Sequence, residues 1–271
     1  MLFSSVIELL ELITKIMAKI NLYRVLYTHY QHQNLDSANK FFVDFGLIPV
    51  HKEDGFIYYR GFGDSPVVYI AEQSPDDSRH FIGGGWAVTT REDLETASKL
   101  AGASSIQSSK APGGGNFVDV KDPNGVNIRL FHGITYRQKD DQEKEKPKPV
   151  VFNTWEEKPR KGEFQRFDGG PSKVHKLGHY GLVVDKSRFD QVVAWYLSTF
   201  NLAETDSLYD EESGKNVLTF MHIDKGETYT DHHVSGERVL LYTYSVVLNP
   251  GCLICAELTI HCKELLYSIT T

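Results

Sequence analysis

Apolar residues recur along this 271-residue chain with two different periods, and the order of those periods predicts the fold. Alternating apolar and polar residues are typical of a strand with one buried face, whereas apolar residues spaced three and four apart indicate a helix. Between residues 22 and 72 the two periods succeed each other as one strand, one helix and three further strands. We therefore expect a β-α-β-β-β unit, with its elements at 22–31, 35–46, 48–52, 56–61 and 67–72.

The same order of elements returns twice. A second unit is expected between residues 81 and 132, with its helix at 92–101. A third is expected between residues 175 and 235, with its first strand at 175–184 and its helix at 189–200. Repeated units of this kind bury their apolar faces against one another. We predict an α+β fold of tandem β-α-β-β-β units that pair into barrels, with the second barrel incomplete. The first and third units also share a His-Tyr pair and a later aromatic residue, as His29-Tyr30 with Phe45 and as His179-Tyr180 with Phe200.

Composition divides the chain into five segments. We expect a leader helix at 1–18, a first paired-unit domain at 19–136, a linker at 137–172, a second domain of one unit at 173–236 and a tail at 237–271. The linker mixes charges with prolines, so it cannot bury enough apolar surface to fold. The leader has apolar residues at helical spacing but no basic face, which favours an appended helix over a membrane-surface anchor.

The tail at 237–271 is apolar, holds all three cysteines and lacks the Asp-Pro-x-Gly turn seen earlier in the chain. Three interpretations compete, and we favour a non-homologous end on a truncated protein. Replacement metal ligands at Glu257 and His261 are not supported by their spacing. A zinc or redox site formed by the cysteines with His261 would place two ligands at adjacent positions, which strains a tetrahedral geometry.

Charge and cysteine content narrow the class of partner. Lys and Arg number 29 against 36 Asp and Glu, a net charge of −7, whereas a nucleic-acid binder needs a basic face. The most apolar stretch is interrupted at Asn249-Pro250-Gly251, before it reaches the roughly twenty residues of a membrane span. We expect a small-molecule ligand, no nucleic acid and no membrane, and a cytoplasmic protein because most of the chain has no cysteine. Homo-oligomerisation is left open.

Histidines on two strand-like segments are the main candidates for chemistry. His179 lies in the alternating run after Leu177-Gly178, and His232-His233 follow about fifty residues later. A neutral imidazole that faces a cavity is the commonest protein ligand for a metal. Adjacent strand residues face opposite sides, so only one of His232 and His233 can point inward.

The turn Asp122-Pro123-Asn124-Gly125, which leads into an alternating strand at the end of a β-α-β-β-β unit, resembles the vicinal oxygen chelate superfamily. That superfamily includes glyoxalases, bleomycin-resistance proteins and extradiol dioxygenases, in which paired units curl around a metal. This chain has Arg129 where the superfamily usually has a carboxylate ligand, and a cation cannot ligate a divalent metal. The resemblance therefore implies a metal-free first domain, with a structural or vestigial role for His29.

A metal-free first domain followed by a metal-binding second domain resembles the type I extradiol dioxygenases. The likeness extends to their fungal branch, the trihydroxytoluene oxygenase or metapyrocatechase-like proteins, through residues 158–167 and 220–233. It implies Fe(II) or Mn(II), a small catecholic substrate, His179 as a metal ligand and His233 as the acid or base.

The same resemblance leaves the activity of this chain open. The family's fourth unit carries a second histidine ligand and a glutamate, and neither is found here. Two histidines and one carboxylate are needed to hold iron while leaving room for a catechol and dioxygen. We expect a weak or inactive extradiol-dioxygenase-like protein, in which metal binding and catalysis are both undecided. The alternatives are a non-catalytic module that binds an aromatic small molecule in the first barrel, and a relative of glyoxalases or isomerases.

Overall fold

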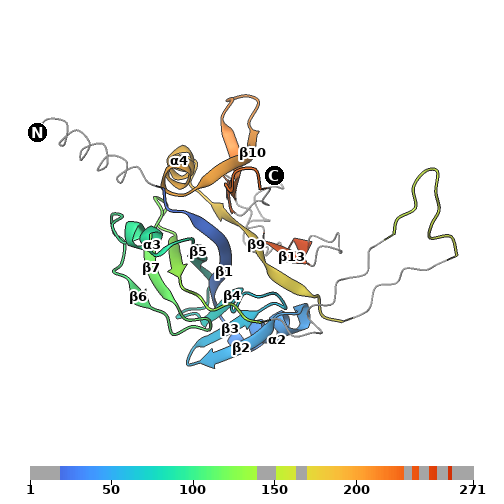
Figure 1. Cartoon of the computed structure of the whole chain (residues 1–271), viewed down its shortest axis with the longest axis horizontal. Coiled ribbons are helices and arrows are strands. Elements are labelled where there is room, and N and C mark those ends of the chain that lie inside the picture. The colour runs from blue at the N-terminus through green and yellow to red at the C-terminus, as the bar shows by residue number, and fades with distance from the viewer. Residues whose placement is uncertain are drawn as a thin grey trace, which may run out of the picture.

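Two β-sheets and three helices make up the described part of the molecule (Figure 1). The α+β class predicted from the sequence is confirmed, whereas closure of the sheets into barrels remains a prediction. The leader at 1–18 and most of the tail lie outside the described residues. The computed structural model describes residues 19–138, 151–162 and 170–228, together with three strands at 234–237, 244–248 and 256–257.

The first sheet has eight strands in the order β2-β3-β4-β1-β5-β8-β7-β6 and contains two β-α-β-β-β units. In the first unit, β1 pairs in parallel with β4, and in the second unit β5 pairs in parallel with β8. Strand β1 also pairs antiparallel with β5, which joins the two units. The elements are β1 (Leu22–His32), α2 (Leu35–Phe45), β2 (Ile48–Glu53), β3 (Phe56–Arg60), β4 (Tyr69–Gln73), β5 (His80–Val88), α3 (Arg91–Ala97), β6 (Gln107–Ser108), β7 (Asn116–Lys121) and β8 (Asn127–His132).

The second sheet repeats the arrangement of the first unit. Its six strands run in the order β10-β11-β12-β9-β13-β14. Strand β9 is parallel to β12 and antiparallel to β13, as β1 is parallel to β4 and antiparallel to β5. Strand β13 belongs to the tail predicted for 237–271, and that tail thus supplies a strand beside β9. The elements are β9 (Val174–Val183), α4 (Phe189–Thr199), β10 (Leu202–Tyr209), β11 (Asn216–Ile223), β12 (Val234–Glu237), β13 (Tyr244–Leu248) and β14 (Ala256–Glu257).

Local sequence explains where the helices of the first sheet begin and end. Asn34 caps α2, because its side chain accepts a hydrogen bond from the backbone N of Ser37 at 2.8 Å. The helix stops at Gly46, whose φ of +120° is unfavourable for residues with a side chain. Thr90 and Asp93 cap α3 reciprocally, each accepting from the backbone of the other.

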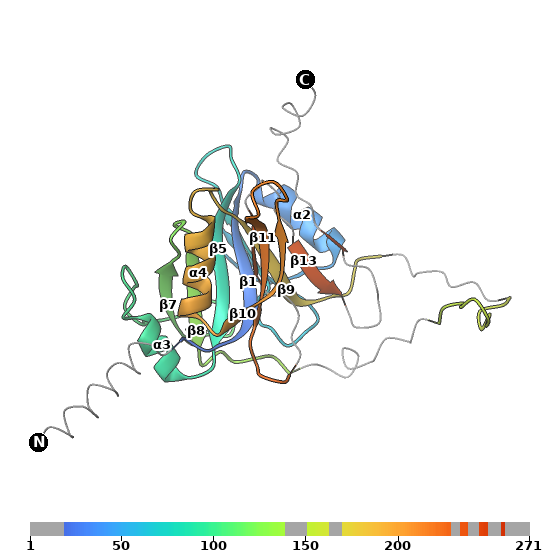
Figure 2. The ribbon, with the colours of Figure 1, turned by 90° about the horizontal axis from the view of Figure 1, so that it is seen from above.

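The two sheets are joined by a reciprocal pair of backbone contacts. The N–H of Ile20, just before β1, donates to the carbonyl of Thr199 at the end of α4 (2.9 Å). The N–H of Ser172, just before β9, donates to the carbonyl of Phe45 at the end of α2 (2.9 Å). One core of buried apolar residues extends through both sheets, and β1 of the first sheet contacts β9 of the second (Figure 2). The units at 19–136 and 173–236 therefore pack as one structure.

A buried hydrogen bond crosses this core. The indole Nε1 of Trp86 donates to the hydroxyl of Tyr180 at 2.8 Å, and both residues are almost fully buried. Gly84 makes room for the tyrosine, because a Cβ at that position would lie 2.6 Å from the hydroxyl oxygen. The glycine run at 83–85, which lies within β5, thus permits close packing.

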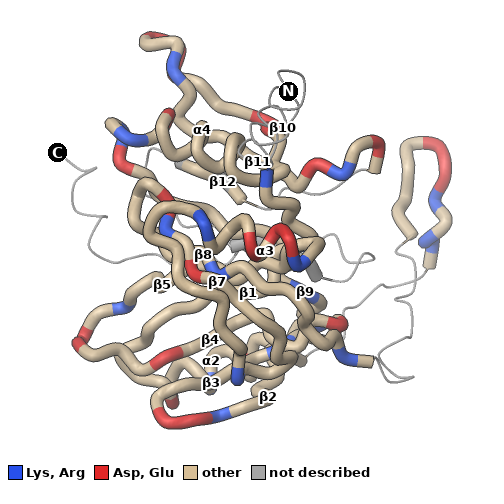
Figure 3. The backbone as a smooth tube through the Cα atoms, turned by 60° about the vertical axis from the view of Figure 1, so that its left-hand side comes forward, with Lys and Arg blue, Asp and Glu red and all other residues tan. Residues whose placement is uncertain are grey.

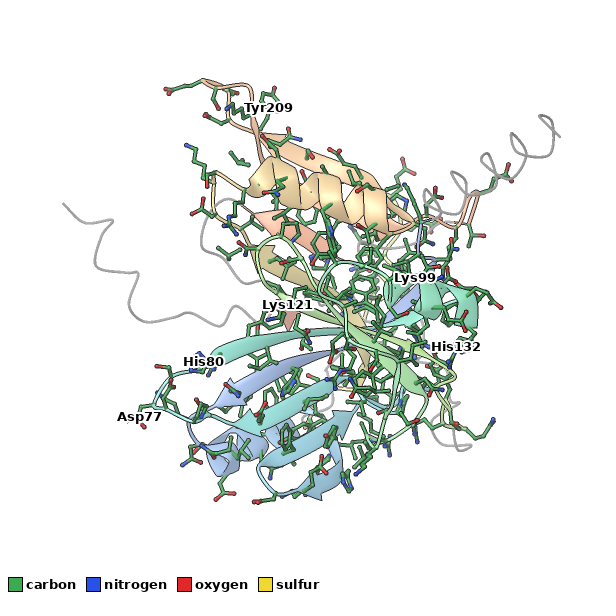
Figure 4. The ribbon with its side chains drawn as sticks, turned by 90° about the vertical axis from the view of Figure 1, so that its left-hand side faces the viewer. Asp77, His80, Lys99, Lys121, His132 and Tyr209 are labelled. Atoms are coloured by element: carbon green, nitrogen blue, oxygen red, sulfur yellow. The ribbon has the colours of Figure 1, made fainter. Side chains whose placement is uncertain are left out.

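The outer surface carries charges of both signs. Figure 3 shows lysine and arginine interspersed with aspartate and glutamate along the described elements. The β10–β11 hairpin projects at one end of the molecule, where Tyr209 lies far from Asp77 and His80 at the other end (Figure 4). Among the described helices, none has the length and apolar character that crossing a membrane requires.

Candidate functional site

Strand β9, at the middle of the second sheet, carries the predicted metal ligand His179. The side chain is well buried, at 6% relative exposure, and its ring centroid lies 5.9 Å from that of Phe220 on β11. The next residue, Tyr180, points into the core and contacts Trp86. His179 therefore faces the opposite side of the sheet from the interface with the first domain.

The strands on either side of His179 are the places from which further ligands could come. In the parallel pairing with β12, Tyr180 lies opposite Val234. His232 and His233, immediately before β12, lie outside the described residues, so the acid or base role of His233 stays a prediction. On the other side, the register of β13 places Ser245 opposite His179. No histidine occupies that β13 position.

The described residues do not form a metal centre around His179. Within this part of the chain, no group of three or more His, Cys, Asp and Glu side chains is placed to hold a metal ion. His222 lies on β11 in the same sheet, but its Nδ1 is engaged by the hydroxyl of Thr205 at 2.7 Å. An iron site of the expected type needs two imidazoles and a carboxylate. The described donor set therefore does not fit that metal.

The first sheet brings together a polar cluster, which we define as His29, Glu72, Asp119 and Arg129. Nε2 of His29 lies 2.8 Å from Oε2 of Glu72. Arg129 donates from Nε and Nη2 to the two carboxylate oxygens of Asp119, at 2.7 and 2.8 Å. Such a two-pronged pair is geometrically specific. Arg129 and His29 both belong to this cluster, and the idea that Arg129 replaces a metal ligand of the superfamily stays a prediction.

Burial and two neighbouring charges have the net effect of lowering the pKa of His29. Burial lowers the pKa of His29, and the Glu72 carboxylate opposes this effect. The charge of Arg129 acts in the same direction as burial. The contact between His29 and Glu72 has the length of an ion pair, but the buried Nε2 lacks a hydrogen bond of acceptable geometry. His29 is thus a partly buried imidazole whose Nε2 atom is buried without a satisfied hydrogen bond.

Sequence reasoning singled out His29 and Arg129 but missed Glu72 and Asp119. A signal was present, because Glu72 lies two residues after the buried Ile70 and so faces the same side of β4. Asp119 sits directly opposite Arg129 in the β7–β8 pairing, which residue spacing alone does not reveal. The cluster is therefore a product of strand register.

A small hollow opens at the first sheet, and no member of the polar cluster lines it. Its lining is almost entirely apolar and includes Leu26, Tyr27, Ile70 and Phe131. The hollow encloses about 20 Å³, which is room for little more than one water molecule. It is too small to enclose an aromatic ring.

The fold resembles that of solved structures of a glyoxalase and of ring-cleaving dioxygenases. A Mn(II)-bound glyoxalase from Novosphingobium aromaticivorans matches 83% of this chain at a TM-score of 0.59 and 16% identity, over 64% of its own length. Homoprotocatechuate 2,3-dioxygenase from Brevibacterium fuscum, in complex with 3,4-dihydroxyphenylacetate, matches 82% at a TM-score of 0.60 and 17% identity, over 62% of its length.

A room-temperature structure of an extradiol ring-cleaving dioxygenase from B. fuscum gives a TM-score of 0.58 at 19% identity, covering 82% of this chain and 55% of the other. The chain thus spans less than two thirds of the length of these proteins. At such low identity the likeness shows the fold alone. No protein-family model matches the sequence, and no curated protein is similar to it in sequence.

Proposed function

We propose that the chain is an extradiol-dioxygenase-like protein that cleaves catecholic rings weakly or not at all. One observation carries this proposal: His179 lies buried on the central strand of the second sheet, at the place that His29 occupies in the first. The fold neighbours include a ring-cleaving dioxygenase, which supports the reaction class. The fungal subtype, the cytoplasmic location and a catecholic substrate belong to the same proposal.

We expect weak or absent turnover because the described residues supply only one metal ligand, His179, whereas the iron centre needs two imidazoles and a carboxylate. In a complete centre, Fe(II) or Mn(II) would bring a catechol and dioxygen together on one ion. His179 could contribute one ligand to such a centre, and Phe220 beside it would restrict the rotation of its ring. A single described ligand is not enough to hold the ion for this reaction. His233 would serve as the proton acceptor if it points to the same side as His179.

Metal content and oxygen consumption test the proposal together. The chain is loaded with Fe(II) without oxygen, desalted and analysed for iron, and oxygen uptake is then followed with catechol and with 3,4-dihydroxyphenylacetate. We expect substoichiometric iron in the wild type and a further loss in His179→Ala. His222→Ala is the matched control, because it removes another histidine of the same sheet and should leave the iron content unchanged.

Equal iron in the wild type and in His179→Ala would overturn the assignment of His179. Circular dichroism of each variant shows whether a lower metal content reflects unfolding. Iron that depends on His179 without catechol-dependent oxygen uptake would favour a relative of glyoxalases or isomerases.

A further inference from the structure

A solvent-exposed stretch at 151–162, which we call the arm, carries three large apolar side chains. Trp155 is fully exposed, Phe152 is 56% exposed and Val151 is 43% exposed. Figure 1 and Figure 2 both show the arm standing away from the two sheets, and no described element of this chain covers the indole. Aromatic side chains contribute much of the energy of an interface when they are buried, and apolar side chains exposed together mark an interaction surface.

Hydrogen bonds within the arm hold its shape. The N–H of Glu157 donates to the hydroxyl of Thr154 at 3.0 Å, and the N–H of Arg160 donates to Oδ1 of Asn153 at 3.1 Å. The side-chain Nε of Arg160, in contrast, is shielded from solvent and has no hydrogen-bond partner among the described residues. A guanidinium donor left unpaired costs free energy, and a carboxylate is its best acceptor. The arm therefore presents an apolar tip beside an arginine whose Nε lacks an acceptor.

The β10–β11 hairpin offers a surface of matching character. Residues 202–223 contain five carboxylates and one lysine. Just before the tip of the hairpin, Leu208 and Tyr209 are 58% and 64% exposed. Glu211 and Glu212 follow at the tip, where both are exposed, and no base of the described part of the chain pairs with either of them. The hairpin thus combines exposed apolar side chains with unpaired acids.

A second copy of this chain supplies what each of the two surfaces needs. The arm carries Lys158, Arg160 and Lys161 against two glutamates, so its net charge is opposite to that of the hairpin. Apolar character and charge are therefore complementary at the same pair of segments. The arm and the hairpin project from different sides of one molecule (Figure 1), which favours contact between molecules over contact within one. A two-fold arrangement satisfies both surfaces of both copies and forms a closed assembly.

We infer that the chain forms a closed dimer, in which the arm of each copy docks on the β10–β11 hairpin of the other. Trp155 packs against the partner's Leu208 and the partner's Tyr209. Arg160 pairs with a carboxylate at the tip of the partner's hairpin, and Lys158 lies beside this pair. Tryptophan, tyrosine and arginine are the side chains that most often carry the binding energy of an interface. The inference concerns assembly, and it is independent of the metal and of the reaction proposed above.

Sedimentation velocity of the intact chain, over a range of protein concentrations and at low and high salt, tests this inference. We expect a monomer–dimer equilibrium that weakens as salt is added, because salt screens the charge pairs. Trp155→Ala should raise the dimer dissociation constant about thirtyfold or more, as for the loss of a central interface residue. Phe41→Ala is the matched control, because it removes another exposed aromatic ring, on α2, and should associate like the wild type.

Charge reversal distinguishes contact between copies from contact within one. Lys158→Glu with Arg160→Glu makes the arm acidic, and Glu211→Lys with Glu212→Lys makes the hairpin tip basic. Either double variant alone should dimerise about tenfold or more weakly than the wild type, because like charges then meet. A mixture of the two double variants should dimerise, since the altered arm of one meets the altered hairpin of the other and the unaltered pair also matches.

Asp54→Lys with Asp77→Lys changes the net charge by the same amount at exposed positions of the first sheet and should leave the dimer intact. The inference is overturned by a chain that stays monomeric at every concentration, or by equal dissociation constants for folded Trp155→Ala and Phe41→Ala. A mixture of the two charge-reversed variants that remains monomeric would overturn it as well. Binding of a monomer to phosphatidylserine vesicles that depends on Trp155 would also overturn it, by assigning the arm to a lipid surface.

Discussion

Burial of His32 at the end of β1 predicts a loss of stability in mild acid. The side chain retains only 7% exposure, its Nε2 lies 2.8 Å from the hydroxyl of Tyr69, and its ring packs edge-on against Phe42 at 5.7 Å. Burial lowers the pKa of His32 from 6.5 to about 4, and the positive charge of Arg79 adds to the effect. The folded protein therefore holds this imidazole in its neutral form.

The sign and size of the effect follow from proton linkage. Between about pH 6.5 and pH 4 the unfolded chain binds a proton at His32 that the folded chain does not bind, so the free energy of unfolding falls as the pH falls. Each unit of pKa difference corresponds to about 1.4 kcal/mol. Between pH 7.5, which lies above this window, and pH 4.5, near its lower end, the loss of unfolding free energy assigned to His32 amounts to about 2 kcal/mol.

Urea unfolding of the wild type and of His32→Gln at pH 7.5, 5.5 and 4.5 measures this loss. Glutamine cannot take up the proton, so the stability advantage of the wild type should shrink by about 2 kcal/mol across the series. His80→Gln is the control, because His80 is an exposed histidine beside Asp76 and its replacement should not narrow the difference in this way. Parallel pH dependences for the wild type and His32→Gln would refute the reasoning.

Two further predictions concern packing between the sheets. Tyr180→Phe removes the acceptor of Trp86 Nε1 inside the core, and we expect a loss of about 1–3 kcal/mol in urea unfolding that largely disappears when Trp86→Phe is also present. Gly46→Ala places a Cβ 1.9 Å from the backbone oxygen of Ser172 at a φ of +120°. The midpoint temperature of thermal unfolding should therefore fall by several degrees. Gly214 has a φ of +63° with open space around it, so Gly214→Ala should lower the midpoint temperature less. Equal decreases for the two variants would contradict the close contact at Gly46.

Much of the local structure was determined by the sequence alone. Strands β1 and β9 and helices α2 and α4 lie within one residue of their predicted bounds at 22–31, 175–184, 35–46 and 189–200. These elements can be predicted because the spacing of apolar residues and the capping residues are local properties of the sequence. Burial is harder to predict from local sequence, since the adjacent residues Phe41 and Phe42 of α2 are half exposed and buried respectively. The predicted helix at 92–101 ends at Ala97, where Ser98 donates to the carbonyl of Glu95.

Only the tertiary structure decided which residues meet. Glu72 lies against His29 because β4 pairs in parallel with β1, and Asp119 lies against Arg129 because β7 pairs with β8. Strand β13 stands beside β9 although its sequence shows none of the motifs of the earlier units. Strand register depends on hydrogen bonds between segments far apart in the chain, and a period of two residues shows which face a side chain occupies but not which partner it faces. The sequence thus determined the elements and the position of His179, while the fold determined the polar cluster.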